Sequence, residues 1–122
     1  MSKSNTVVHT QDLGDSQFRD VTVYYEKGGI NYWDYSRKPM GIYVSVTRYR
    51  REGAIRTWST GQKGDGYLLI VPLDRYRRRA FTDTIEAVKA NIEDFLGRWD
   101  AGNPDGVVAL LTGQAEPAAA AA

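Results

Sequence analysis

The middle of the chain consists of short runs in which hydrophobic and polar residues alternate, a pattern typical of strands with one buried face. Residues 42–49 show it most clearly, because Ile42, Val44 and Val46 alternate with aromatic or hydroxyl-bearing side chains. Residues 54–60 have a similar pattern, whereas residues 67–71 are apolar throughout, which indicates a central strand or one buried on both faces. Together with a further alternating run before the first Gly-Gly pair, these segments predict four antiparallel strands joined by glycine-containing turns.

The next part of the chain has a helical period. Apolar residues recur every three or four positions, at Phe81, Ile85, Val88, Ile92, Phe95, Leu96 and Trp99. Asp83 and Glu86 have the spacing of an N-terminal capping box, and Gly102 lies beyond the expected C-terminus. An earlier start near Asp74 is the alternative, because Leu73 and Tyr76 extend the apolar stripe. A helix over residues 83–99 would be about 25 Å long, enough to lie across four strands, and a short further helix is indicated after Asn103. The predicted fold class is therefore α+β, with a curved four-stranded antiparallel sheet followed by a long amphipathic helix packed on one face.

The two ends of the chain lack such patterns. Residues 1–20 mix polar residues with isolated apolar ones, and residues 114–122 finish in a run of alanines, so we expect a flexible N-terminal arm and a disordered Ala-rich tail. Residues 21–113 then form a single α+β domain, as expected of a chain of 122 residues. No run approaches the roughly 18 apolar residues of a membrane span, and no address signal is visible, so the sequence predicts a soluble, cytoplasmic protein without membrane contact.

Few residues are suited to catalysis. The chain has no cysteine, which excludes thiolate metal sites and cysteine nucleophiles, and its one histidine, His9, lies in the expected arm. Acids such as Glu86 and Glu93 lie on the polar face of the predicted helix, where a solvated surface is the simplest explanation. Residues 61–66 are rich in glycine, but a strand follows them where a phosphate-binding loop needs a helix. We therefore expect a non-catalytic protein with no cofactor and no metal site.

The net charge of +1 is a cancellation between two parts of the chain. Residues 34–79 hold eleven Lys and Arg against four acids, and the rest of the chain holds five against eleven. Such asymmetry suggests a surface that faces a polyanion, backed by an acidic one. The alternative is an arginine-rich solvated surface.

Arginines and aromatic residues are interleaved on the predicted strands. Single-stranded nucleic acid is bound by this combination, because cations contact phosphates while flat rings stack on unpaired bases. The predicted phosphate contacts are Arg48, Arg50, Arg51, Arg56 and Lys63, and the predicted stacking residues are Tyr43, Tyr49 and Trp58. The sequence thus predicts that an open, aromatic and basic face of the sheet binds single-stranded DNA or RNA. The alternative is that the three rings form cross-strand pairs or a second core covered by a partner.

The order of four antiparallel strands and a long amphipathic helix in residues 21–99 is similar to the repeat of the Pur-alpha and Whirly families and of the positive-cofactor-four coactivators. The best local match is residues 42–56, where an alternating strand, a charged turn and a second strand bearing Arg56 resemble the Pur repeat. This resemblance implies single-strand binding by two paired units, and hence a homodimer. The chain departs from the Pur repeat at Thr47 and Tyr49, where that repeat tends to place a lysine and an asparagine that touch nucleic acid.

Residues 25–33, Tyr-Glu-Lys-Gly-Gly-Ile-Asn-Tyr-Trp, and residues 41–46 resemble segments of small proteins encoded by phages and mobile elements. The resemblance supplies no activity, but it implies an alternative function as an accessory protein that binds a host protein, for example an inhibitor of host defence. The aromatic loop would be its anchor, because Tyr and Trp are favoured at binding hot spots. The predicted partner-binding residues are Asn31, Tyr32, Trp33 and Tyr35. A hydrophobic cap over one end of the core is the alternative for this loop.

Overall fold

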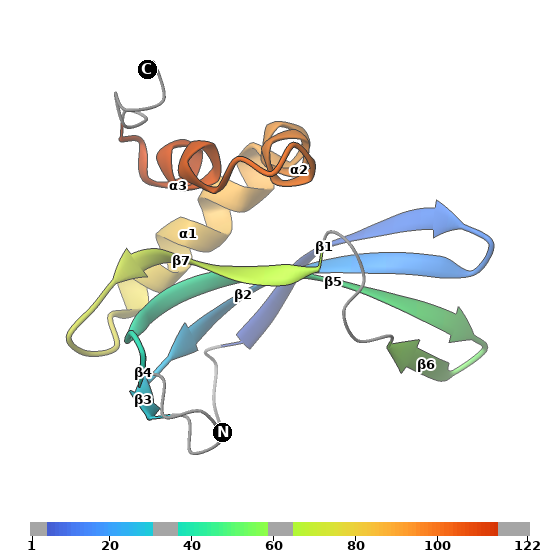
Figure 1. The fold of residues 1–122 in the computed structure, drawn as a ribbon, viewed down its shortest axis with the longest axis horizontal. Helices are drawn as coiled ribbons and strands as arrows, with labels where there is room; N and C mark the ends of the chain where they lie inside the picture. Colours follow the sequence, from blue (N-terminus) through green and yellow to red (C-terminus); the bar gives the residue numbers. More distant parts are fainter. Residues whose placement is uncertain (1–4, 31–36, 59–64, 115–122) are drawn as a thin grey trace.

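A computed structural model describes residues 5–30, 37–58 and 65–114, with only the backbone of Gly29 and Ile30. It shows a mixed α+β fold in which three helices cover one face of a five-stranded antiparallel sheet (Figure 1). The sheet strands are β1 (Asn5–Gly14), β2 (Gln17–Glu26), β5 (Gly41–Glu52), β6 (Ile55–Trp58) and β7 (Gly66–Pro72). A separate two-stranded ribbon is formed by β3 (Gly29–Ile30) and β4 (Arg37–Lys38). The helices are α1 (Arg78–Ala90), α2 (Ile92–Asp100) and α3 (Pro104–Thr112).

Strand β5 is the centre of the sheet. It pairs with β2 along nearly its whole length, from Gly41 to Arg50, and its other edge is shared between β7 at one end and β6 at the other. Each of the four alternating or apolar runs lies in a strand of this sheet, although β2 begins earlier than its run and the described part of β6 is shorter than the predicted segment. The sheet has a fifth strand, β1, that the pattern did not predict.

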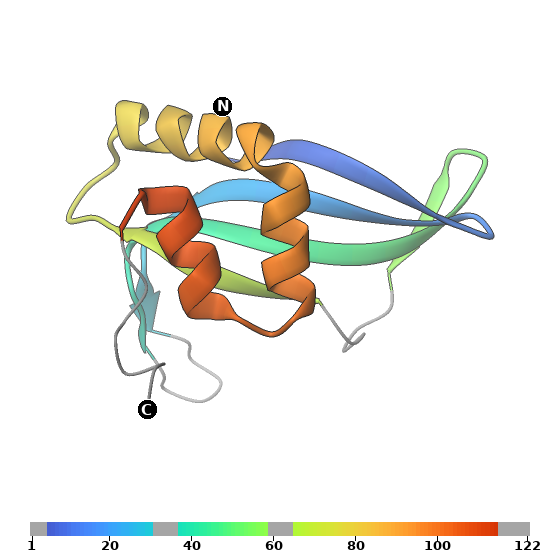
Figure 2. The same ribbon diagram turned by 90° about the horizontal axis from the view of Figure 1, so that it is seen from above.

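The core lies between the sheet and the helices. The register of β2 and β5 pairs Val21 with Val46 and Val23 with Val44, and all four side chains are fully buried. These aliphatic side chains meet Phe95 and the other buried residues of the three helices, which are seen over the sheet in Figure 2. The even positions of β5 are therefore core positions, as the alternation predicted.

The prediction of one long helix over residues 83–99 is wrong, because the helix is interrupted at Asn91. The backbone of Asn91 leaves the helical region, with φ −126° and ψ 30°. The Asn91 side chain donates from Nδ2 to the carbonyl oxygen of Ala87 at 2.9 Å. Asparagine side chains compete in this way with the backbone ladder. The apolar stripe continues into α2 because both helices lie on the same face of the sheet. The first helix also begins at Arg78, before the predicted cap at Asp83.

The short helix predicted after Asn103 is confirmed as α3. The Asn103 side chain accepts a hydrogen bond from the backbone N–H of Gly106 at 3.0 Å, and Pro104 occupies the first turn. None of the helices in the described residues has the length and apolar character needed to cross a membrane.

The expected flexible arm over residues 1–20 is wrong for residues 5–20, which form β1 and the start of β2. Asn5 to Gly14 pair with Tyr24 to Gln17 in antiparallel register. Two register shifts, at Val8 and near residue 13, break the period-two pattern, and β1 is a polar strand at the edge of the sheet. Because of the register shifts and the polar side chains, the sequence of β1 lacks the alternation that indicates a strand. Of the predicted tail, only Gln114 belongs to the described residues.

Candidate functional site

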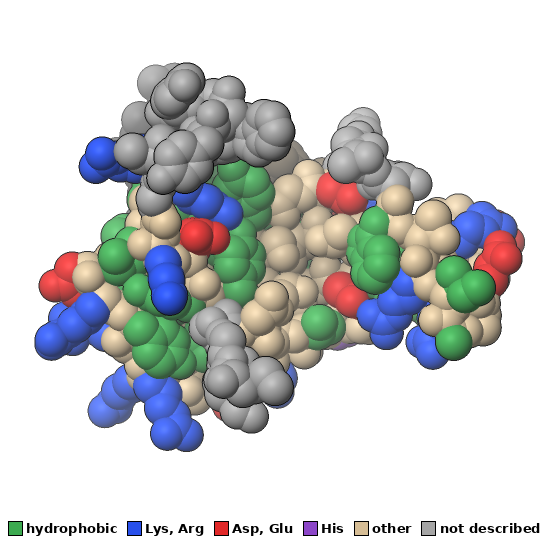
Figure 3. Space-filling view, turned by 90° about the horizontal axis from the view of Figure 1, so that it is seen from below, with side chains coloured by type: hydrophobic (Ala, Val, Ile, Leu, Met, Phe, Trp, Pro, Cys, Tyr) green, Lys and Arg blue, Asp and Glu red, His purple; other side chains and the backbone are tan. Residues whose placement is uncertain are grey.

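The face of the sheet opposite the helices, which we call the open face, carries the odd-numbered side chains of β5. Strand alternation places Tyr43, Ser45, Thr47 and Tyr49 on this face. Figure 3 views it directly and shows hydrophobic side chains in separate groups, with a hollow of mainly other side chains between them. The open face therefore has the concave, partly aromatic form expected of a binding surface.

The first group, the tyrosine cluster, consists of Tyr24, Tyr43 and Tyr67 around the ammonium group of Lys38. Tyr24 and Tyr43 lie opposite each other in register, and their rings are nearly parallel with centroids 5.5 Å apart. The Tyr67 ring centroid is 6.0 Å from that of Tyr43. Lys38 Nζ lies 5.4, 4.9 and 4.4 Å from the ring centroids of Tyr24, Tyr43 and Tyr67. Cation–π attraction thus attaches the end of β4 to the open face.

Lys38 keeps its positive charge in this cluster. Its Nζ is 3.4 Å from Glu26 Oε2 and donates to the hydroxyl oxygen of Tyr24 at 3.4 Å. Burial opposes the charge, but Tyr24 and Glu26 outweigh it and hold the pKa of Lys38 above its ordinary value. Burial also raises the pKa of Tyr24 and of Tyr43, so both phenols are neutral at pH 7. The cluster therefore presents a cation framed by uncharged rings.

The second group, the tryptophan cluster, consists of Phe18, Tyr49, Trp58 and Arg56. Phe18 and Trp58 flank Tyr49 from the two neighbouring strands, with ring centroids 5.8 and 5.6 Å from that of Tyr49. The Arg56 guanidinium carbon lies 5.1 Å from the Tyr49 ring centroid. The Tyr49 hydroxyl donates to Asp20 Oδ1 at 3.1 Å, and burial together with this hydrogen bond raises the pKa of Tyr49. This cluster, like the first, pairs a cation with neutral aromatic rings.

A groove of about 780 Å³ lies between the two clusters. Hydroxyl side chains form its floor and aromatic rings its sides; these residues are Thr22, Ser45, Thr47, Tyr24, Tyr67 and Trp58. Tyr43 and Tyr49 are six positions apart on β5, so the two clusters are about 20 Å apart along the strand. The groove is long enough for an extended chain and is lined by stacking surfaces and hydrogen-bonding groups.

The groove lies where β5 changes partner. Val46 of β5 still pairs with Gly66 of β7, and Tyr49 already pairs with Trp58 of β6. Between them, the backbone N–H of Arg48 donates to Asp65 Oδ1 at 3.0 Å. The Asp65 side chain thus replaces a backbone partner and closes the fork on the side of β7.

The three predicted stacking residues differ in how far their rings are exposed. Tyr43 and Tyr49 belong to the open face, but they are only 2% and 5% exposed because rings from the neighbouring strands cover them. Trp58 is 54% exposed and Tyr67 is 63% exposed. The accessible rings of the groove are therefore Trp58, which was predicted, and Tyr67, which was not. Lys38 was also missed, because its place above three rings depends on the path of the chain before β5.

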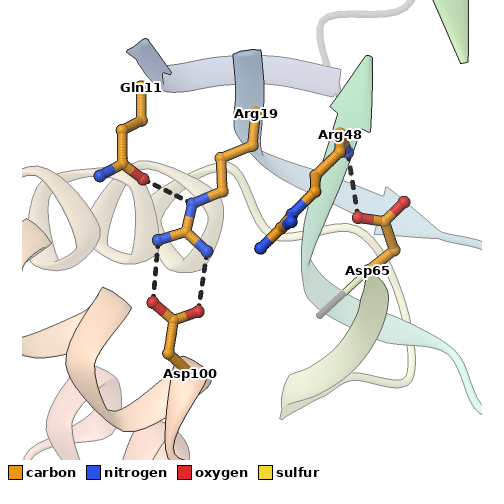
Figure 4. A network of polar contacts seen from close by, with 5 residues as sticks. All are labelled: Gln11, Arg19, Arg48, Asp65 and Asp100. Carbon is orange, nitrogen blue, oxygen red and sulfur yellow. Dashed lines mark hydrogen bonds and ion pairs between the residues drawn. The ribbon is translucent and has the colours of Figure 1, made fainter. Parts of the chain in front are cut away.

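The expectation that the basic residues share one side of the sheet is wrong. Alternation sends Arg51 and Arg56 to the open face and sends Arg48 and Arg50 to the opposite one. Figure 4 shows the Arg48 side chain pointing toward α2, beside that of Arg19. Lys63 and the predicted partner-binding loop, residues 31–35, lie outside the described residues.

A polar contact on the helix side joins the sheet to the end of α2. Arg19 is almost fully buried and donates from both terminal nitrogens to Asp100, at 2.7 and 3.0 Å, while its Nε donates to Gln11 (Figure 4). The hydrogen bonds from Arg19 hold the pKa of Asp100 below its ordinary value. The positive charge of Arg48 also lowers the pKa of Asp100. The Nε of Arg48 is buried without a hydrogen-bond partner.

We expect Asp100→Asn to lower the free energy of unfolding at pH 7 by about 1–2 kcal/mol, because it leaves the buried Arg19 charge without its counter-ion while Asp100 itself is half exposed. Since the pKa of Asp100 is lower in the folded state, its contribution is present above its ordinary pKa of about 4 and disappears as the pH falls through the folded value. Urea unfolding of both proteins across this range checks this. A difference in stability that stays constant down to pH 2 would contradict the assignment.

Within the part of the chain that the structure describes, no three His, Cys, Asp or Glu side chains gather closely enough to hold a metal ion. Comparison with family models, with curated proteins and with solved structures finds no match. The similarity to the Pur-alpha, Whirly and positive-cofactor-four proteins and to phage proteins therefore stays a prediction.

Proposed function

We propose that the protein binds single-stranded DNA or RNA, without catalysis, in the groove of the open face. The observation that carries this proposal is the pair of exposed rings, Trp58 and Tyr67, on opposite sides of one groove. Each belongs to a cluster that also holds a cation, Arg56 or Lys38. Rings beside cations are the combination that binds unpaired bases and their phosphates.

Each part of the groove suits one part of an unpaired strand. Bases stack on Trp58 and Tyr67, and Arg51, Arg56 and Lys38 attract the phosphates at the two ends. The floor contributes hydroxyl groups and Asp65, whose carboxylate and the neighbouring hydroxyls contact base edges. The buried Tyr43 and Tyr49 support the exposed rings from beneath, so they act as positioning residues.

Duplex DNA fits this surface less well. Proteins that read the major groove commonly insert a basic helix, and here the helices cover the other face of the sheet. Residues 83–100, which make up most of α1 and all of α2, hold five acids against two basic residues. The open face is a concave sheet, which suits a flexible strand that can follow its curvature.

Fluorescence anisotropy with labelled single-stranded oligonucleotides tests the proposal, with one DNA probe and one RNA probe. We expect binding that weakens steeply between roughly 50 and 200 mM salt. Trp58→Ala and Tyr67→Ala should each weaken binding by about 5- to 150-fold, the cost of about 1–3 kcal/mol per stacked base. Ile55→Ala is the matched control, because Ile55 is 69% exposed on the opposite face of the same strand as Trp58.

An equal loss of affinity in the Ile55 and Trp58 variants would place binding elsewhere on the molecule. A flat titration at low salt with both probes would overturn the proposal. It would favour the alternative, an accessory protein of a phage or mobile element that binds a host protein.

A further inference from the structure

The free edge of β7 has the sequence of an internal strand. Residues 67–71 are apolar throughout, and β7 contains no charged residue. Among the described residues, β7 pairs with β5 alone, so its second edge is unpaired. Unpaired edges expose backbone donors and acceptors, and proteins usually protect them with charge, proline or a bulge.

The other edge of the sheet is built differently. Strand β1 carries Asp12, His9, two threonines and a glutamine, and two register shifts distort its pairing with β2. These are the features that prevent a further strand from adding to an edge. Strand β7 has one bulge, between the partners of Ile42 and Tyr43, and a proline only at its last position. The two edges therefore differ in how they are protected, and β7 is the one suited to pairing.

A groove of about 570 Å³ runs beside the β7 edge, between this strand, α1 and α3. Its apolar part includes Leu69, Val71, Val108 and Leu111. Side chains of a strand added to β7 would enter this groove at alternate positions. The edge thus offers both backbone hydrogen bonds and an apolar contact surface.

The charges around β7 differ between its two ends. The start of α3 lies beside the Gly66 end of β7, because Pro104 and Val107 line a pocket with Tyr67 and Leu68. The end of α3 lies beside the Pro72 end, because Leu111 and Thr112 line the groove with Leu69 to Pro72. The Gly66 end therefore lies near Asp65 and the exposed Asp105. The Pro72 end leads into exposed arginines, at positions 75, 77, 78 and 79, which outnumber the two nearby acids, Asp74 and Asp83. An antiparallel partner with the same charges would set the basic end of each copy against the acidic end of the other.

We propose that this surface binds a second copy of the chain, and that two β7 strands pair in antiparallel fashion about a twofold axis near Leu69. Such an interface is self-complementary in its backbone hydrogen bonds, its apolar side chains and its charges. It continues the sheet from one protomer into the other, so the two open faces form one surface. Tyr67, on β7, brings the two grooves close to the axis.

The test is the mass of the protein in solution, measured by light scattering after gel filtration without nucleic acid. We expect the wild-type protein to have twice the 13.7 kDa mass of the chain, as a dimer. The Leu69→Lys protein should have the mass of one chain, because the ammonium groups of the two copies would meet at the twofold axis. Leu69 lines the groove but does not belong to the core cluster, so the substitution removes no side chain from the core. The matched control is Leu13→Lys on β1, where the leucine is 37% exposed; this variant should remain a dimer.

A second variant decides the matter if Leu69→Lys does not fold. Asp105→Arg changes only the surface of α3 and places a cation against the partner's basic end, so it should raise the dimer dissociation constant about fivefold. A monomeric wild-type protein at concentrations up to about 100 µM would overturn the proposal. A dimer unaffected by both substitutions would overturn it as well. Because no ligand is present, neither result depends on nucleic-acid binding.

Discussion

Replacing Gly41 by alanine is expected to lower the free energy of unfolding by about 3 kcal/mol or more. Gly41 begins β5 and is opposite Pro72 in the register with β7. A β-carbon at this position would collide with the carbonyl oxygen of Val71 and come within 2.7 Å of Leu69 Cδ1. Because one of these neighbours is backbone, the clash can be relieved only if the two strands separate.

Denaturant unfolding of the Gly41→Ala protein measures the effect. Gly97→Ala is the control, because Gly97 lies in α2 with no atom within 4 Å of a β-carbon built there. That substitution should raise the free energy of unfolding by about 0.5–1 kcal/mol through helix propensity. If both variants have the same stability as wild type, β5 and β7 do not approach each other as the structure shows.

Replacing Asp65 by alanine is expected to cost about 1–3 kcal/mol, because the Arg48 N–H loses its partner at the fork between β6 and β7. The loss should be local. Hydrogen exchange at the Arg48 amide should become faster, while exchange at core amides such as Val44 changes only by the loss of global stability.

Asp65→Asn is the matched control for this substitution. The amide oxygen still accepts from the Arg48 N–H, but without the strength that the charge adds, so we expect less than half of the alanine effect. A loss of stability that is equal in the two variants would show that the charge of Asp65, and not its hydrogen bond, stabilises the fork.

The local pattern of the sequence predicted most elements of the fold. Alternation of apolar side chains depends on the strand itself, and so β2, β5, β6 and β7 and the core positions of β5 were recognised. The break at Asn91 was missed because the apolar stripe has the same period on both sides of it. Strand β1 was missed because an edge strand is stabilised by its neighbour, and its own sequence has little pattern.

The candidate site was only partly predictable for a related reason. The face on which each β5 side chain lies follows from alternation, so Tyr43 and Tyr49 were correctly placed together. Their burial depends on register, because the rings that cover them come from other strands. The same is true of Lys38, whose three ring contacts join residues that are far apart in the sequence.

The division of β5 between two partners has a mechanical consequence. One half of this strand contributes Ile42, Val44 and Val46 to the core beneath the helices. The other half extends beyond the helices and pairs with β6, whose side chains are all exposed (Figure 1). The two sides of the groove are thus attached to the part of the sheet that the helices cover and to the part that extends beyond them. A bend of β5 near Thr47 would therefore change the width of the groove without displacing the valines of the core.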